Sequence, residues 1–128
     1  SSKNEGKSMK KVINFKEKFN QFDELWSPKI ISEMNNYEFK LVKVKDDFVW
    51  HKHDETDEVF IVIEGKLYIE LLEETVEIEA GEMYVVPRGV KHRPFSKVLT
   101  KIMLVEKQGV VNTGDADSEL TASNKKWI

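Results

Sequence analysis

Two stretches decide the fold of this chain: H-K-H-D-E-T-D-E-V-F-I-V-I-E-G at 51–65 and G-E-M-Y-V-V-P-R-G-V-K-H at 81–92. Each contains a short apolar run bounded by polar residues, glycine or proline. Valine, isoleucine, tyrosine and phenylalanine favour strands, and glycine and proline supply the backbone angles that tight turns need. Both stretches therefore predict short strands joined by sharp reversals, with a hairpin at 64–66 and a corner at 87–89.

The same strand pattern extends along the chain from residue 29 onward. Runs rich in β-branched and aromatic residues, often alternating with polar ones, predict strands at 29–34, 37–45, 48–53, 58–63, 66–72, 76–80, 83–86 and 98–106. This succession of short strands predicts an antiparallel sandwich or barrel. The clear helical signal is Phe15, Phe19 and Phe22, whose spacing predicts one short amphipathic helix that covers the core.

The length of 128 residues fits one domain. Residues 1–8 are small and polar, and we expect them to be the remnant of an expression tag before Met9. Residues 9–128 are expected to form a single domain. Within it, 107–128 is polar and lacks strand periodicity, so an extended or loosely ordered tail is expected there.

Composition argues against several classes of function. The 20 basic and 23 acidic residues are interleaved and give a net charge of −3, which predicts no nucleic-acid partner. The chain has no cysteine, so it has no disulfide framework and no thiolate nucleophile, and we expect a cytoplasmic protein. No apolar run approaches the roughly 20 residues that span a bilayer, so no membrane partner is expected either.

The three histidines and one glutamate are the candidate metal ligands. His51 and His53 are two residues apart in a predicted strand, so their side chains share one face and their Cα atoms lie about 7 Å apart. Glu58 begins the next strand after a polar turn, and a hairpin would return it to the same face. His92 follows the later corner, so a folded barrel has to bring it to the pair. Such a set suits a divalent first-row metal and leaves positions open for water or substrate.

Each of these features also has an ordinary explanation when it is taken alone. A histidine pair in a strand is often two half-exposed polar residues. The acidic run 54–58 alone is a solvated turn, and His92 alone is a surface histidine of a hairpin. The residues by themselves therefore leave the metal site as one of two interpretations.

Together the two stretches resemble the two motifs of the cupins. Residues 51–65 match H-x-H-x(3,4)-E-x(6)-G, and residues 81–92 match G-x(5)-P-x-G-x(2)-H. The chain is similar to small single-domain cupins of the mannose-6-phosphate-isomerase-like kind, with a barrel core at about 37–106 and, at 111–115, a segment that resembles one after the last strand of such proteins. The resemblance implies an all-β fold, a double-stranded β-helix or jelly-roll barrel, here with a short N-terminal helix.

The same resemblance implies that His51, His53, Glu58 and His92 bind the metal. Two positions depart from the family pattern. Lys45 stands where a glycine usually opens the first motif, and Ser96 stands where an asparagine often closes the second. Neither position supplies a ligand, so the implied metal site is unaffected.

The strand expected at 48–53 bears on the oligomeric state. If His51 and His53 face inward, alternation turns Phe48 and Trp50 outward, where large apolar side chains need a cover. The N-terminal segment or a second subunit would provide it. Because cupins commonly pair through sheet edges, we expect a homodimer.

Residues beyond the four ligands give weaker signals. Arg88, Lys91 and Arg93 surround His92 and could attract an anionic substrate, although a solvated basic hairpin is the simpler explanation. Tyr84 and Lys43 are candidate acid–base groups only if their strands turn them inward. No catalytic residue is therefore assigned, and no organic cofactor is expected.

Three functions are compatible with the sequence. The first is a metal-dependent enzyme that acts on a small polar metabolite, with isomerase, oxygenase and lyase chemistry all open because a widely shared fold does not choose among them. The second is a non-catalytic module that binds or senses a small ligand such as a sugar. The third is a structural jelly roll without a metal. The expected cofactor is a divalent transition metal, Zn, Mn, Fe or Ni.

Overall fold

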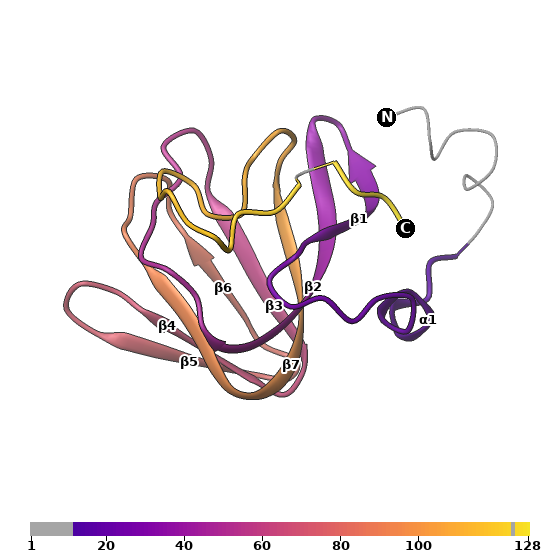
Figure 1. The fold of residues 1–128 in the computed structure, drawn as a ribbon, viewed down its shortest axis with the longest axis horizontal. Coiled ribbons are helices and arrows are strands. Elements are labelled where there is room, and N and C mark those ends of the chain that lie inside the picture. Colours follow the sequence, from indigo (N-terminus) through magenta and orange to yellow (C-terminus); the bar gives the residue numbers. More distant parts are fainter. Residues whose placement is uncertain (1–11, 124) are drawn as a thin grey trace.

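The computed structural model describes residues 12–123 and 125–128, so the tag prediction for 1–8 lies outside the described residues. Its elements are α1 (Phe15–Phe19), β1 (Lys29–Met34), β2 (Tyr37–Asp47), β3 (Glu58–Glu64), β4 (Lys66–Glu70), β5 (Thr75–Glu79), β6 (Met83–Val86) and β7 (Arg93–Lys107) (Figure 1). Every pair of neighbouring strands is antiparallel. The prediction of a mostly β protein with one short helix is confirmed for this part of the chain, in which no helix is long and apolar enough to cross a membrane.

Strand β7 is the centre of the fold. Its second half lies between β2 and β3, and its beginning pairs with β4. The sheet runs in the order β1-β2-β7-β3-β6, with β5 attached through β4. Among the described residues β6 pairs only with β3 and β5 only with β4, so the strand pairing is open and does not form the closed barrel that the sequence predicted.

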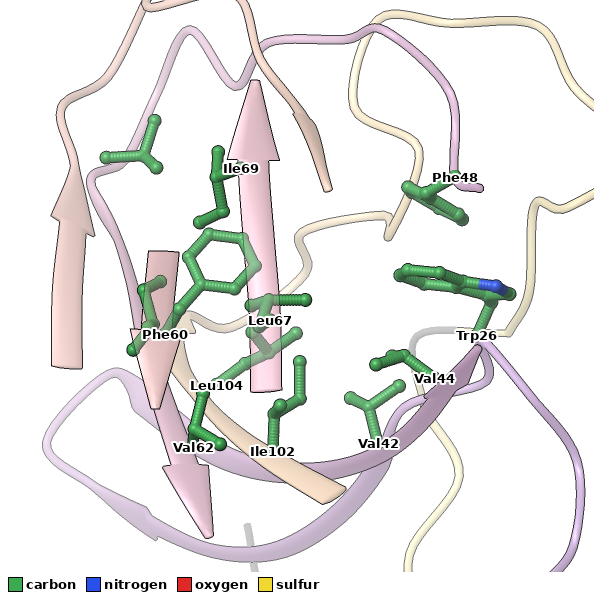
Figure 2. Packing of buried hydrophobic residues seen from close by; sticks show 12 residues of the cluster. Trp26, Val42, Val44, Phe48, Phe60, Val62, Leu67, Ile69, Ile102 and Leu104 are labelled. Atoms are coloured by element: carbon green, nitrogen blue, oxygen red, sulfur yellow. The ribbon is translucent and has the colours of Figure 1, made fainter. Parts of the chain in front are cut away.

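The strands curve around one apolar interior, into which the labelled side chains of β2, β3, β4 and β7 point (Figure 2). Phe60 is the register partner of Leu104 and Val62 that of Ile102, so these four side chains share the inner face. The predicted common face of Glu58, Phe60 and Val62 is confirmed, because all three are buried while the residues between them are not. Burying each large apolar side chain contributes about 1.5 to 3 kcal/mol.

The opposite face of the sheet is partly covered by α1. The side chain of Asn14 caps the helix by accepting a hydrogen bond from Glu17 N at 2.9 Å. Phe19 and the following Phe22 are buried there with Leu41 and Met103. The helix is shorter than the spacing of phenylalanines predicted, because it ends at Phe19 and leaves Phe22 in the loop.

The structure has no strand at 48–53, so the sequence-based prediction of a strand there is wrong. Asp46 has φ +62° and the pairing of β2 with β7 shifts register there, so the regular alternation stops before Phe48. Phe48 consequently turns inward and is buried, stacked on Trp26 with ring centroids 4.6 Å apart (Figure 2). Trp50 is half-exposed, as expected.

The C-terminal segment folds back over the sheet (Figure 1). Asn112 is buried, donates to Trp26 O at 2.9 Å and to Leu120 O at 2.8 Å, and accepts from Ala122 N at 2.9 Å. Ile128 N donates to Ile30 O at 3.1 Å, which ties the last residue to β1. The segment is therefore more firmly attached than its polar composition predicted.

Candidate metal centre

His51 and His92 are brought together by backbone pairing outside the regular strands. His51 N donates to His92 O at 3.0 Å and His92 N donates to His51 O at 2.9 Å. The two rings lie 4.3 Å apart between centroids, and both side chains are buried. The antiparallel bridge thus links the two sequence motifs at two of the candidate metal ligands.

Both of these imidazoles have a fixed tautomer. His51 Nδ1 lies 2.8 Å from Val49 O, and His92 Nδ1 lies 2.9 Å from Val90 O. A carbonyl oxygen only accepts hydrogen bonds, so each Nδ1 carries a proton, and in the neutral ring Nε2 is the nitrogen with the free lone pair. Imidazoles held in this way are oriented as metal ligands before a metal binds.

Glu58 lies in front of the imidazoles. Its Oε1 is 3.2 Å from His53 Nε2 and 3.5 Å from His92 Nε2. All three atoms are buried, and none has a hydrogen-bond partner among the described residues. Ligand atoms of His51, His53, Glu58 and His92 lie within 4.8 Å of one another. The structure therefore brings together all four residues that the sequence singled out, in a cluster that could hold a metal.

Unpartnered buried polar atoms are rare because leaving them so costs free energy. Here three of them converge, and the donor set of neutral imidazole nitrogen and carboxylate oxygen suits a divalent transition metal. A bound metal would satisfy these atoms together, so the residues present fit such an ion.

The protonation states of His51 and Glu58 favour metal binding at neutral pH. Burial, together with the neighbouring His92, lowers the pKa of His51 to about 4, so this imidazole is neutral. Burial alone would raise the pKa of Glu58, but the approach of His53, His92 and Glu106 outweighs it and holds that pKa well below its usual range. Metal binding at these two residues needs little proton release.

Glu106 lies next to Glu58 in the pairing of β3 with β7, and Lys40 contacts Glu106. Neither residue was predicted from the sequence. Lys40 Nζ donates to Glu106 Oε1 at 3.0 Å, and both side chains are fully buried. Burial raises the pKa of Glu106 well above its ordinary value, the Glu58 carboxylate acts in the same direction, and Lys40 opposes them. The signal was present, because Glu106 continues the inward alternation of Ile102 and Leu104 on a predicted strand.

A small apolar cavity adjoins the cluster. Its volume is about 30 Å³, and its walls include His51 and Glu58 together with Trp26, Phe48 and Phe60. Its other lining side chains are Pro28, Val42, Val44, Pro94, Ile102, Leu104 and Asn112. Asn112 is already engaged by hydrogen bonds to the backbone, so this cavity offers no free acid or base beyond the candidate ligands.

A larger, open groove of about 400 Å³ reaches His53 from outside. It lies between the turn after His53 and the start of the C-terminal segment, and its charged lining side chains are Lys52, Asp54, Glu55, Lys107 and Asp115. The groove therefore presents a polar approach to the cluster, in contrast to the apolar cavity.

The C-terminal segment is fastened beside the histidine pair. Lys52 N donates to Asp115 Oδ1 at 2.8 Å, and Asp115 N donates to Lys52 O at 3.2 Å. Gly114 has φ +55°, and a Cβ at this position would lie 2.2 Å from Lys52 O and 3.2 Å from His51 Cδ2. Only glycine fits so close to the candidate ligand.

The candidate acid–base groups Tyr84 and Lys43 lie on different faces of the sheet, and the basic residue Arg93 is held in ion pairs. Tyr84 is the register partner of Phe60 and packs against the interior, whereas Lys43 donates to Phe22 O at 2.6 Å on the opposite face. Arg93 is paired with Asp47 and Glu70. Its pKa is raised because these two carboxylates outweigh the opposing effect of burial, the largest single influence. It is therefore engaged within the fold.

Comparison with known proteins gives a consistent result. The family model described as Cupin domain matches residues 39–104. The uncharacterized protein YdbB of Bacillus subtilis is 34% identical over 99 residues, which cover 77% of this chain and 88% of that protein. A cupin-2 domain containing protein from Shewanella frigidimarina is 55% identical, with a TM-score of 0.74 over 75% of this chain and 94% of the other. Protein NMB1881 from Neisseria meningitidis is 35% identical, with a TM-score of 0.70 over 76% and 99%.

Proposed function

Because the chain belongs to the cupin domain family, we propose that its strands wrap as a jelly roll. We also propose that this fold holds a divalent transition metal, Zn, Mn, Fe or Ni. Its ligands are His51, His53, Glu58 and His92. The observation that carries the proposal is the convergence of ligand atoms from all four buried residues within 4.8 Å, three of them without a hydrogen-bond partner among the described residues. Membership of the mannose-6-phosphate-isomerase-like group and a cytoplasmic location stay predictions.

The function that this centre supports best is a metal-dependent enzyme acting on a small polar metabolite. The metal, when bound, would supply Lewis-acid or dioxygen-activating chemistry at its open coordination positions. The groove at His53 supports a polar substrate, because lysine and carboxylate side chains line its walls. The apolar residues around the cavity give the inner side of the centre few polar groups besides the candidate ligands.

Elemental analysis tests the metal site. The protein is purified without a nickel affinity column, and metal content is measured for the parent and for the double variant His51→Ala/His53→Ala. Close to one metal per chain is expected in the parent, and loss of that metal in the variant. Glu58→Gln should also lose metal, whereas Glu64→Gln, an exposed glutamate at the end of the same strand, should not. A parent protein without metal would overturn the proposal.

A probe of open coordination positions tests the enzyme interpretation. In the cobalt-substituted protein, azide should change the visible absorption spectrum by binding to the metal from the groove. Lys107→Glu, which reverses a charge in the groove lining, should weaken azide binding, whereas the remote Lys66→Glu should not. A spectrum that azide leaves unchanged would show that no position is open, and this would contradict a metal-dependent enzyme.

The second candidate is a module that binds or senses a small ligand such as a sugar without transforming it. The observation that favours it is the absence of a free acid or base among the residues that line the cavity, apart from the candidate ligands themselves. Native mass spectrometry of the purified protein distinguishes the two. A retained small molecule that is recovered unchanged after long incubation supports binding, and consumption of a metabolite supports catalysis.

We also propose that the chain forms a homodimer. Phe48 no longer supports this, because it is buried inside the subunit. The support comes from Met83 and Val85, which are exposed on the edge strand β6. Their register partners Ile61 and Val59 are only partly buried, so the apolar surface continues onto β3. A second copy would cover this surface.

A further inference from the structure

Three glutamates form one buried row across neighbouring strands. Glu38 on β2 is the register partner of Glu106 on β7. The pairs Val59 with Val105 and Phe60 with Leu104 place Glu58 on β3 next to Glu106 on its other side. All three glutamates are buried. Acidic side chains directly opposite one another repel, and their burial costs free energy, so this arrangement needs a specific compensation.

Lys40 supplies a cation to this row from the same face of β2. Its Nζ lies 3.0 Å from Glu106 Oε1 and 3.7 Å from Glu38 Oε1, and it also donates to Val110 O at 3.4 Å. The lysine is only 1% exposed, which is rare for this residue type. These contacts fix one oxygen of Glu106, while its Oε2 is buried and has no hydrogen-bond partner among the described residues.

Stability alone does not account for this pair. A buried ion pair is often no more stabilising than an apolar pair of the same volume. The position of the pair gives a better account, because Glu106 flanks the carboxyl group of Glu58, whose Oε1 lies 3.2 Å from His53 Nε2. Residues that hold a metal ligand in place commonly change metal affinity when they are replaced.

We infer that Glu106, anchored by Lys40, is a positioning residue that fixes the carboxylate of Glu58 in front of the imidazoles and so sets the affinity of the centre for its metal. The inference rests on the proposed metal site. It assigns a role to two residues, on β2 and β7, that lie outside both sequence motifs. Lys40 and Glu106 are 66 residues apart in the sequence.

The test compares the parent with Lys40→Met/Glu106→Met, which replaces the ion pair by an apolar pair of similar volume. Affinity for Zn²⁺ and Co²⁺ is measured by competition with a chelating dye, and the visible spectrum of the cobalt form is recorded. We expect a ten- to hundredfold weaker affinity, by analogy with other second-sphere replacements, and a shifted cobalt band. Thermal unfolding of the metal-free protein shows whether the fold is retained. If the double variant does not fold, Glu106→Met alone is measured, because Lys40 then keeps its ion pair with Glu38.

Two further variants separate positioning from a general loss of stability. Glu106→Gln keeps an oxygen for Lys40 and offers an amide donor to Glu58, so its metal affinity should stay within about threefold of the parent. Lys43→Met removes another buried lysine from the same strand but from the opposite face, where Lys43 donates to Phe22 O. This variant should lose stability without losing metal affinity.

The measurements separate a failure of the proposed metal site from a failure of the positioning role of Glu106. A parent that binds no metal overturns the proposed metal site itself. A parent that binds metal, with unchanged affinity and cobalt spectrum in the Lys40 and Glu106 variants, overturns the positioning role alone. Equal weakening by Lys43→Met would also overturn it, because the effect would then follow stability and not the contact with Glu58.

Discussion

At the scale of single residues, the buried His51 makes the stability of the metal-free protein depend on pH. Its pKa is about 4 in the folded chain and 6.5 in the unfolded chain. Below pH 6.5 the unfolded chain therefore binds a proton that the folded chain does not, so folding is weakened as the pH falls. We expect the free energy of unfolding to drop by about 2 kcal/mol from this residue between pH 7.5 and pH 5.

Urea unfolding in the presence of a metal chelator at several pH values measures this effect. His51→Gln is the comparison, because glutamine does not titrate and its variant should lose much less stability over the same range. Above pH 6.5 the contribution of His51 is fully present, and below its folded pKa of about 4 the contribution is lost. Equal slopes for parent and variant would show that His51 is not the group responsible.

Gly114 is predicted to be irreplaceable for a different reason. Alanine at this position would combine a left-handed backbone with a Cβ only 2.2 Å from Lys52 O. We expect Gly114→Ala to cost about 3 kcal/mol or more, and to weaken metal binding because the backbone beside His51 has to move. Gly81→Ala is the control, since Gly81 has φ +87° but nothing lies within 4 Å of its Cβ position. It should cost about 1 to 2 kcal/mol and leave metal binding unchanged. Equal losses in denaturant unfolding would contradict the prediction.

The candidate site was largely predictable from sequence, and its surroundings were not. His51, His53, Glu58 and His92 share a recognisable spacing, and the structure brings their ligand atoms together. Glu106 was missed although it continues the inward alternation of Ile102 and Leu104, because a glutamate near the end of a strand is more often solvated than buried. Its partner Lys40 lies 66 residues away, and only the pairing of β2 with β7 makes the two neighbours.

At the scale of elements, the C-terminal segment depends on one side chain. Asn112 makes three hydrogen bonds, and replacing it by alanine leaves Trp26 O and Leu120 O without that donor and Ala122 N without that acceptor. We expect Asn112→Ala to lower the free energy of unfolding by about 2 to 4 kcal/mol. Thermal or denaturant unfolding measures the change.

The control for this prediction is Asn36→Ala, which replaces an exposed asparagine in the turn between β1 and β2. A surface replacement of this kind should change stability by no more than about 0.5 kcal/mol. If Asn112→Ala were equally mild, the segment after β7 would not be fastened by this side chain. The same variant should raise proteolysis after residue 112, since the loosened segment becomes accessible.

Strand positions followed from period-two alternation wherever the backbone stayed regular. The predicted bounds of β1 and β6 agree with the structure, and those of β3 and β5 differ by single residues. The expectation failed at 48–53, where the left-handed Asp46 interrupts the alternation. It also missed the beginning of β7, because the predicted strand started at residue 98 although Arg93 and Pro94 already pair with β4. Irregular backbone and long-range pairing leave little trace in local composition.

At the scale of the whole molecule, the apolar surface of β6 and β3 predicts the oligomeric state. Met83→Glu/Val85→Glu places two charges on this surface, and we expect it to convert a dimer into a monomer, because burying unpaired carboxylates in an interface is unfavourable. Sedimentation velocity measures the mass. Leu72→Glu changes an even more exposed apolar residue in the loop between β4 and β5, and this control should remain dimeric. A monomeric parent would refute the homodimer.

The position of β7 in the sheet has a consequence for how the protein is made. This strand contributes partners to β2, β3 and β4, yet it is the last strand to be synthesised. A nascent chain that has reached only residue 92 has none of these pairs, and its apolar strands stay exposed on the ribosome. The sheet can therefore be completed only after residues 93–107 have been synthesised, and the large sequence separation of the pairs makes folding slow, on the order of milliseconds to seconds. Ribosome-bound chains stalled before β7 should be cleaved readily by protease, and chains released after residue 107 should become resistant.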